Sequence, residues 1–127
     1  MSSPKIRVLI IDDTDPVRES LCEYLEDCGF AVRGATDADQ GMQLLAQEPA
    51  DAVVVDLRLP GISGEAFIRQ AIARWPQLRF LIFTGSIEFQ LSEDLATFSQ
   101  ISPEILIKPL LDLNILTEKI TRLVARS

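Results

Sequence analysis

Histidine is absent from this 127-residue chain, and cysteine occurs only twice, as Cys22 and Cys28. Without histidine, the chain cannot carry a Ser-His-Asp or Cys-His catalytic centre, and it lacks the nitrogen ligands of most zinc sites. The spacing of the two cysteines fits no common metal-binding motif. We therefore interpret both as half-buried structural thiols on one helix.

Long apolar runs are also missing, because the longest uninterrupted stretches, such as Val8–Ile11 and Phe80–Phe83, are four residues long. Stretches this short cannot span a bilayer. The chain before the first acidic pair has no apolar segment of signal-peptide length, so we expect a cytoplasmic protein.

Positive charge is scarce, with 12 lysines and arginines against 19 aspartates and glutamates, which gives a net charge of −7. Such an acidic surface repels phosphate backbones and anionic lipid headgroups. We therefore expect neither direct nucleic-acid binding nor membrane binding. The hydrophobic content of 47% is typical of a globular protein. No repeat or linker-like run interrupts the chain, so residues 1–127 are expected to form a single domain.

Short apolar runs rich in Val, Ile and Phe recur along the chain, and they are nearly continuous rather than alternating with polar residues. This pattern indicates strands that are covered on both faces. The predicted strands are Ile6–Ile11, Phe30–Val32, Ala52–Val55, Phe80–Phe83 and Ile105–Ile107.

Helical patterns lie between these runs. The first has Asp15 as the expected N-cap, Pro16 at its first position and Gly29 as its stop signal. The others are expected over Asp37–Gln47, over a stretch carrying Phe67, Ile68, Ala71, Ile72 and Trp75, over a stretch carrying Leu91, Leu95 and Phe98, and from Asp112 onward with Leu116, Ile120, Leu123 and Val124 buried. Alternating strands and helices predict an α/β fold, with a parallel sheet that has helices on both faces.

Four of the five predicted strands end in polar or charged groups, namely Asp12 with Asp13, Asp56, Thr84 and Lys108. Because the carboxyl ends of parallel strands share one edge of the sheet, we expect these groups to lie together. Taken singly, each has an ordinary explanation: the aspartates can cap helices, Thr84 can be a loop hydroxyl, and Lys108 can be a solvated charge. Their joint occurrence at one predicted edge favours a functional site.

The chemistry of the group follows from its charges. Three clustered carboxylates repel one another unless a cation neutralises them, and oxygen ligands suit a hard divalent ion such as Mg²⁺. An aspartate carboxylate is a competent nucleophile toward phosphorus and forms an acyl phosphate. A hydroxyl such as Thr84 and an ammonium such as Lys108 can then hold the remaining phosphoryl oxygens.

These residues lie in stretches that strongly resemble the receiver domain of two-component response regulators, with a chemotaxis-regulator-like arrangement. The stretches are IRVLIIDDTDPVRESLCEYLEDCGFAV, DAVVVDLRLPGISGEAFIRQ, FLIFTGS and EILIKP, and the resemblance covers residues 5–125. The family's acidic pair matches Asp12 and Asp13, and its phosphoacceptor matches Asp56. Its hydroxyl residue matches Thr84, and its lysine matches Lys108.

The phosphoacceptor position begins a D-x-x-x-P-x-x-x-G pattern that Pro60 and Gly64 complete. The resemblance implies a flavodoxin-like, doubly wound parallel sheet of five strands in the order 2-1-3-4-5, with five helices. It also implies a cis peptide bond between Lys108 and Pro109.

The resemblance further implies how such a domain works. Mg²⁺ would be held by Asp13, Asp56 and the backbone carbonyl of Arg58, with Asp12 acting through water. A histidine kinase or a histidine phosphotransfer protein would phosphorylate Asp56, and the change would reach a downstream protein partner or an output domain. The domain is not expected to be an enzyme for other substrates, since it catalyses only its own phosphorylation and dephosphorylation.

One position departs from the family pattern. The switch aromatic, usually Phe or Tyr three residues before the lysine, is Ile105 here, and Pro103 precedes it. Ile105 has neither a ring nor a hydroxyl for a rotamer switch, so we expect the response to run through the loop Gly85–Gln90 and the following helix. Phe89 in that loop is a candidate partner contact.

Two alternatives remain open. Asp13, Asp15 and Val17 fit the D-x-D-x-T/V signature of haloacid-dehalogenase-type phosphatases, although no further acidic pair follows a later strand and Asp56 is left without a role. Such an enzyme would turn over a generic phosphate ester many times. The second alternative is a receiver-like interaction module that works without phosphate, and the altered switch region is compatible with it. Such modules usually lose the acceptor aspartate or part of the acidic pair, whereas this chain keeps all five positions.

Overall fold

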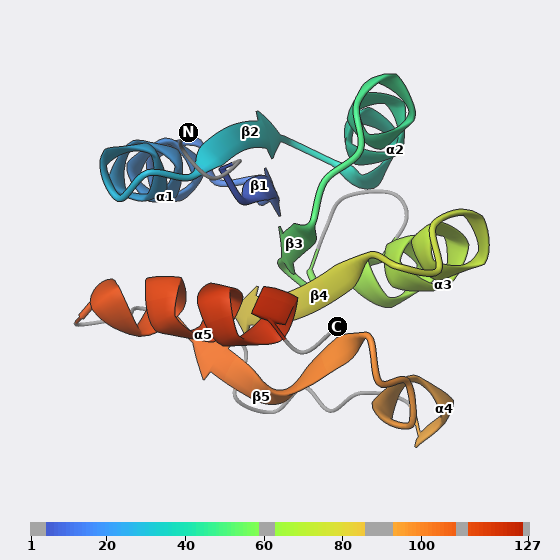
Figure 1. Cartoon of the computed structure of the whole chain (residues 1–127). Helices are drawn as coiled ribbons and strands as arrows, with labels where there is room; N and C mark the ends of the chain where they lie inside the picture. Colours follow the sequence, from blue (N-terminus) through green and yellow to red (C-terminus); the bar gives the residue numbers. More distant parts are fainter. Residues whose placement is uncertain (1–4, 59–62, 86–92, 109–111, 126–127) are drawn as a thin grey trace.

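The computed structural model describes residues 5–58, 63–85, 93–108 and 112–125, in which five strands and five helices alternate along the chain (Figure 1). The strands are β1 (Arg7–Ile11), β2 (Ala31–Ala35), β3 (Ala52–Val55), β4 (Arg79–Thr84) and β5 (Ile101–Ile107). The helices are α1 (Asp15–Asp27), α2 (Ala38–Gln47), α3 (Gly64–Arg74), α4 (Glu93–Ala96) and α5 (Asn114–Ala125). No helix in these ranges is both long and apolar enough to cross a bilayer.

The strands form one parallel sheet of order β2-β1-β3-β4-β5, which confirms the predicted flavodoxin-like topology. The chain first crosses from β1 outward to β2 and then returns past β1 to β3. This reversal places helices on both faces of the sheet, because each parallel crossover is right-handed. In Figure 1, α1 and α5 lie on one face, and α2, α3 and α4 lie on the other.

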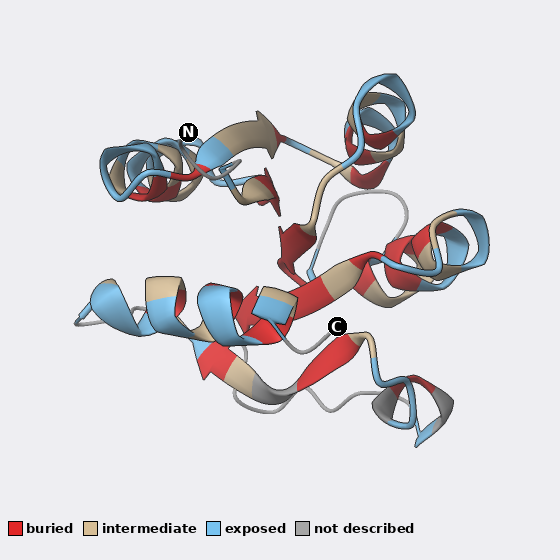
Figure 2. Cartoon of the chain, in the orientation of Figure 1, coloured by how far each residue is buried: buried red, intermediate tan, exposed pale blue. Residues whose placement is uncertain are grey.

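The core consists of two apolar layers, because successive residues of a strand point to opposite faces. In β1, Leu9 and Ile11 face the layer under α2, α3 and α4, whereas Val8 and Ile10 face the layer under α1 and α5. Figure 2 shows the central strands buried, while the edge strand β2 is only partly covered. The nearly continuous apolar runs of the sequence therefore reflect burial on both faces.

Helix α1 begins as predicted at the Asp15–Pro16 pair, but its N-cap is Thr14 rather than Asp15. Thr14 has an extended backbone, and its carbonyl accepts a hydrogen bond from the Arg18 N–H at 2.9 Å. Asp15 therefore lies inside the first turn, where a negative charge is favoured by the helix dipole.

The two cysteines lie at different depths. Cys22 is half-buried within α1, as predicted, whereas Cys28 is exposed at the C-cap, so the prediction is wrong for Cys28. The next residue, Gly29, adopts a φ of 95°, which ends the helix as its position in the sequence predicted. The Phe30 N–H then donates to the Leu25 carbonyl at 3.0 Å, and this turn leaves Cys28 on the outside.

The largest departure from the sequence prediction lies around α4. The predicted helix buries Leu91, Leu95 and Phe98, but α4 has four residues, and only Leu95 is shown buried. Phe98 lies beyond the helix with 37% exposure, and Leu91 lies outside the described residues. The Phe80 N–H donates to the Gln100 carbonyl at 2.8 Å, so the chain turns directly after α4 to begin β5.

Strand β5 is longer than predicted and begins at Ile101 rather than Ile105. Phe80 pairs with Ile101 and Ile82 pairs with Ile105, so the register shifts between these two pairs. An irregularity of this kind on an edge strand can accommodate a proline, here Pro103. The proline made the first half of this strand unrecognisable from the sequence.

Candidate functional site

Three aspartates meet where β1 and β3, neighbours in the sheet, come to an end. Asp12 and Asp13 follow β1 and Asp56 follows β3, and carboxylate oxygens of all three lie within 4.8 Å of one another. Asp12 and Asp56 are only 2% and 7% exposed, whereas Asp13 is open to solvent. Backbone hydrogen bonds extend the sheet into the site, from the Asp12 N–H to the Ala35 carbonyl and from the Asp56 N–H to the Ile11 carbonyl, both at 3.1 Å.

The two buried carboxylates each use one oxygen to hold their own loop. Asp12 Oδ1 accepts a hydrogen bond from the Thr14 N–H at 2.8 Å, and Asp56 Oδ1 accepts one from the Arg58 N–H at 3.0 Å. Asp12 therefore does not cap α1, whose N-cap is Thr14 and has no side-chain cap bond, but it holds the turn that leads into the helix. This role occupies Oδ1 and leaves Oδ2 for the site.

Lys108 connects the far edge of the sheet to the aspartates. Its ammonium donates hydrogen bonds to Asp12 Oδ2 and Asp56 Oδ2, the latter at 3.0 Å. The start of its path is fixed by a hydrogen bond from its backbone N–H to the Thr84 carbonyl at 2.9 Å. The ammonium also lies 5.5 Å from the centre of the Phe83 ring, a cation–π distance.

Two opposed effects set the pKa of Lys108. Burial lowers it, but the hydrogen bonds and charges of Asp12 and Asp56 outweigh burial and raise the pKa above its usual value. The ammonium is therefore charged at neutral pH. Three carboxylates against one ammonium leave two negative charges, which a divalent cation would balance. Because the ligand atoms are all oxygens, the residues present fit Mg²⁺.

Thr84 and Arg58 complete the set of residues expected from the sequence. Thr84 is the last residue of β4, the strand beside β3, and it is fully buried. Arg58 lies two residues after Asp56, and its side chain is exposed. The structure thus gathers Asp12, Asp13, Asp56 and Lys108 directly, with Thr84 and Arg58 at the same edge of the sheet.

Gly64 explains one end of the D-x-x-x-P-x-x-x-G pattern in steric terms. A Cβ atom at this position would lie 2.6 Å from the Asp56 carbonyl oxygen and 2.7 Å from the Leu57 Cα. Helix α3 begins here, with the Gly64 N–H donating to the Leu57 carbonyl at 3.1 Å and Ser63 as its N-cap. Only glycine lets the helix start so close to the Asp56 loop. Pro60 lies outside the described residues.

Two residues near the site were missed by sequence reasoning. Phe83 provides the ring beneath the Lys108 ammonium, and Arg18 donates a hydrogen bond from Nη1 to the Asp12 carbonyl at 2.8 Å. The three-residue spacing of Asp15 and Arg18 on a helix could have indicated the ion pair that they form. Nothing in the sequence pattern indicated the bond to Asp12.

Ile105 occupies the position of the expected switch aromatic. It pairs with Ile82 of β4 and is half-buried against the core layer of α2, α3 and α4. It is therefore a packed strand residue. The Lys108–Pro109 bond and the part of the predicted response loop from residue 86 to 90, including Phe89, lie outside the described residues.

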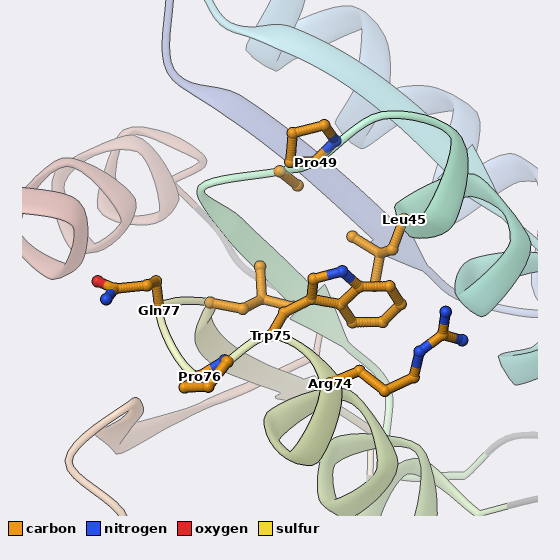
Figure 3. Close-up of a pocket in the computed structure, with 8 residues that line it drawn as sticks. Leu45, Pro49, Arg74, Trp75, Pro76 and Gln77 are labelled. Carbon is orange, nitrogen blue, oxygen red and sulfur yellow. The ribbon is translucent and has the colours of Figure 1, made fainter.

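A separate apolar pocket of about 220 Å³ lies at the opposite end of the sheet (Figure 3). Its lining comes from the ends of α2 and α3 and from the segments that connect them to β3 and β4, and the indole of Trp75 lies between Leu45 and the Arg74 side chain. The Arg74 guanidinium stacks over the indole at 4.6 Å. None of the site residues expected from the sequence lines this pocket.

Comparisons with known proteins agree with this geometry. A family profile described as the response regulator receiver domain matches residues 8–120. The hydrogenase transcriptional regulatory protein HoxA of Cupriavidus necator is 30% identical over 95 residues, which cover 75% of this chain and 19% of that protein. The response regulator MprA of Mycolicibacterium vanbaalenii is 35% identical over 80 residues, which cover 63% of this chain and 35% of that protein.

The chain therefore spans only about a fifth to a third of the length of these curated relatives. Among solved structures, the response regulator TrrA from Thermotoga maritima, in complex with Mg²⁺-BeF, superposes with a TM-score of 0.80 at 22% identity. The match covers 93% of this chain and 98% of that one, and it shows a shared fold.

Proposed function

Since this chain belongs to the response regulator receiver domain family, we propose that it is a signalling switch that accepts a phosphoryl group on Asp56 with the help of Mg²⁺. Membership of the family implies phosphorylation-dependent signalling. What we propose is the identity of the acceptor residue and of the groups that assist the transfer. The observation that carries it is the convergence of Asp12, Asp13, Asp56 and the Lys108 ammonium at one edge of the sheet.

The order of the strands supports Asp56 as the acceptor. β3 lies between β1, which ends in Asp12 and Asp13, and β4, which ends in Thr84. A phosphoryl group on Asp56 would therefore have carboxylates on one side and the Thr84 hydroxyl on the other. The Lys108 ammonium already contacts Asp56 Oδ2 at 3.0 Å. A phosphoryl group on Asp12 would be separated from Thr84 by the whole width of β3.

The metal ligands would be the carboxylates of Asp13 and Asp56 and the backbone carbonyl of Arg58, with Asp12 acting through water. A bound Mg²⁺ would supply positive charge that reduces the repulsion between the attacking carboxylate and the incoming phosphoryl group. The exposure of Asp13 supports this assignment, because the ion can enter from solvent without opening the core.

In the proposed reaction, a carboxylate oxygen of Asp56 attacks phosphorus, and the bond from phosphorus to the donor breaks. The electron pair of that bond leaves with the donor, which is the imidazole of a histidine kinase or a histidine phosphotransfer protein. The Lys108 ammonium passes from the carboxylate to a phosphoryl oxygen, and the Thr84 hydroxyl donates to another. The product is an acyl phosphate that water later hydrolyses.

The direct test is intact-mass spectrometry after incubation with acetyl phosphate and Mg²⁺. We expect one added phosphoryl group on the wild-type chain, none on Asp56→Asn, and none when Mg²⁺ is chelated. Asp15→Asn is the matched control, because Asp15 is an exposed aspartate of the same region that lies outside the acidic cluster. Label that persists in Asp56→Asn would place the acceptor elsewhere. Loss of label in Asp15→Asn would favour the haloacid-dehalogenase-type phosphatase, whose sequence signature includes Asp15.

Calorimetry tests the metal assignment separately. Mg²⁺ should bind weakly to the wild-type chain, and binding should be nearly lost in Asp13→Asn, which removes both a ligand and a charge. An unchanged affinity in Asp13→Asn would contradict the proposed ligand set.

The partners follow from the proposed chemistry. The donors would be a histidine kinase or a histidine phosphotransfer protein, and the reader would be a downstream protein or an output domain, as the name of the transcriptional regulator HoxA suggests. Because such kinases draw phosphate from ATP, the proposed place of action is the cytoplasm.

We propose that the response to phosphorylation does not involve rotation of the side chain at position 105, because Ile105 is aliphatic and packs against the core. Thr84 is followed directly by Gly85 and the segment between β4 and α4, so a Thr84–phosphoryl bond is proposed to bias that segment. Amide exchange with and without beryllofluoride should change within residues 85–99. Changes confined to the aspartate cluster would favour an interaction module that works without phosphate.

A further inference from the structure

The guanidinium of Arg18 holds the loop that carries the acidic pair. Nη1 donates to the backbone carbonyl of Asp12 at 2.8 Å, and Nη2 donates to the carboxylate of Asp15 at 2.5 Å. The Asp12 carbonyl belongs to the peptide unit that joins Asp12 to Asp13. Arg18 therefore contacts the backbone between two aspartates of the cluster without contacting either carboxylate of the pair.

The position of the Arg18 side chain is also fixed by its packing against β2. The side chain is only 14% exposed, although it lies near the start of a surface helix. Its stem crosses β2 at Gly34, where a Cβ atom would lie 3.1 Å from Arg18 Cδ and 3.2 Å from Arg18 Cγ. Glycine weakens a strand interior and often marks close approach of another group. The presence of Gly34 in β2 is thus explained by the passage of Arg18.

The contacts of Asp12 show what this bond controls. The Asp12 N–H donates to the Ala35 carbonyl at 3.1 Å, and Asp12 Oδ1 accepts from the Thr14 N–H at 2.8 Å. The bond from Arg18 fixes the remaining backbone group, the carbonyl. Because a peptide unit is planar, fixing that carbonyl also fixes the direction in which the chain enters Asp13. Asp13 is exposed, so its carboxylate depends on the backbone for its placement.

We propose that Arg18 is a positioning residue for the metal site, which orients the Asp12–Asp13 peptide so that the Asp13 carboxylate faces Asp56. The proposal rests on the proposed function, because it takes these carboxylates as Mg²⁺ ligands. Groups that orient metal ligands from behind typically change metal affinity by about 10- to 100-fold when they are removed.

The test compares Arg18→Ala with Arg33→Ala. Arg33 is a matched control because it also donates two hydrogen bonds, to the carbonyls of Leu44 and Glu48, both at 2.7 Å, but these lie on and after α2. Arg18→Ala should weaken Mg²⁺ binding about tenfold in calorimetry. It should also speed exchange of the Thr14 amide, measured without Mg²⁺. Arg33→Ala should leave both unchanged.

Two further variants keep the test decisive. Asp15→Asn retains the bond from Arg18 to the Asp12 carbonyl, so its Mg²⁺ affinity should stay within about twofold of the wild type, well short of the effect of losing an orienting group. Arg18→Lys preserves the charge but lacks the planar guanidinium, whose two nitrogens bond the Asp12 carbonyl oxygen and the Asp15 carboxylate. It should fall between the wild type and Arg18→Ala, and it replaces Arg18→Ala if that variant does not fold.

Equal loss of Mg²⁺ affinity in the Arg18 and Arg33 variants would overturn the proposal, since it would indicate general destabilisation. Unchanged Thr14 exchange in the Arg18 variants would overturn it whatever the metal result. If the wild-type chain does not bind Mg²⁺ at all, the proposed function fails, and faster Thr14 exchange confined to the Arg18 variants would still support the positioning of the loop.

Discussion

At the scale of single residues, Gly64 shows how a sequence motif can have a steric cause. The glycine stands eight positions after Asp56, and its backbone lies against that residue's own peptide unit. At Gly85, by contrast, a Cβ atom would meet no atom of the described residues within 4 Å. The two glycines therefore make a matched pair for testing whether the start of α3 shapes the Asp56 loop.

We predict that Gly64→Ala lowers the free energy of unfolding by about 1–3 kcal/mol, because the new methyl group would overlap backbone atoms that cannot move independently. Gly85→Ala should change it by no more than about 0.5 kcal/mol, because no atom of the described residues lies close to the new methyl group. Urea unfolding monitored by circular dichroism measures both. Similar effects of the two substitutions would contradict the steric explanation.

The two cysteines give a second prediction at this scale. Burial raises the pKa of the Cys22 thiol, and the nearby carboxylate of Glu26 raises it further. A raised pKa keeps Cys22 protonated to higher pH, and the thiolate is the reactive form. Cys28 is exposed, so iodoacetamide at pH 8 should modify Cys28 before Cys22. Peptide mass spectrometry follows the two rates, and faster modification of Cys22 would show that the depths assigned here are wrong.

At the scale of elements, the local sequence pattern predicted a strand's bounds correctly where every residue of that strand is buried. Ala52–Val55 was predicted with the bounds that β3 has, because an apolar run buried on both faces has sharp ends. The predictions failed at α4 and β5, where a non-local contact decides the outcome. The pairing of Phe80 with Ile101 starts β5 early and ends the helical pattern before Phe98. No residue within that stretch carries this information.

Because α4 is short, we predict different stability effects for two residues that the sequence pattern placed on the same buried helix face. Leu95 is fully buried and Phe98 is 37% exposed. Leu95→Ala should lower the free energy of unfolding by about 2–5 kcal/mol, because it opens a cavity in the core. Phe98→Ala should cost no more than about 1 kcal/mol. A larger cost for Phe98→Ala would mean that the helix extends to residue 98 and buries the ring, as the sequence pattern alone predicts.

At the scale of the whole molecule, the convergence of the aspartates could be predicted because it depends only on topology. Parallel strands end at one edge, so residues that follow β1 and β3 must meet there, whatever the side chains do. The contact of Lys108 with both Asp12 and Asp56 depends instead on a side chain that reaches from β5 across the ends of the intervening strands. The bond from Arg18 depends likewise on side-chain path, and neither has a signature in local sequence.

The proposed function requires this edge of the sheet to direct a phosphoryl group to Asp56. The most direct measurement is reduction with borohydride after incubation with acetyl phosphate and Mg²⁺, because an acyl phosphate is reduced to the alcohol and leaves homoserine at the modified aspartate. Tandem mass spectrometry of the peptides then locates that residue. We predict homoserine at position 56 alone. Homoserine at position 12 or 13, or no conversion at all, would contradict the proposed function.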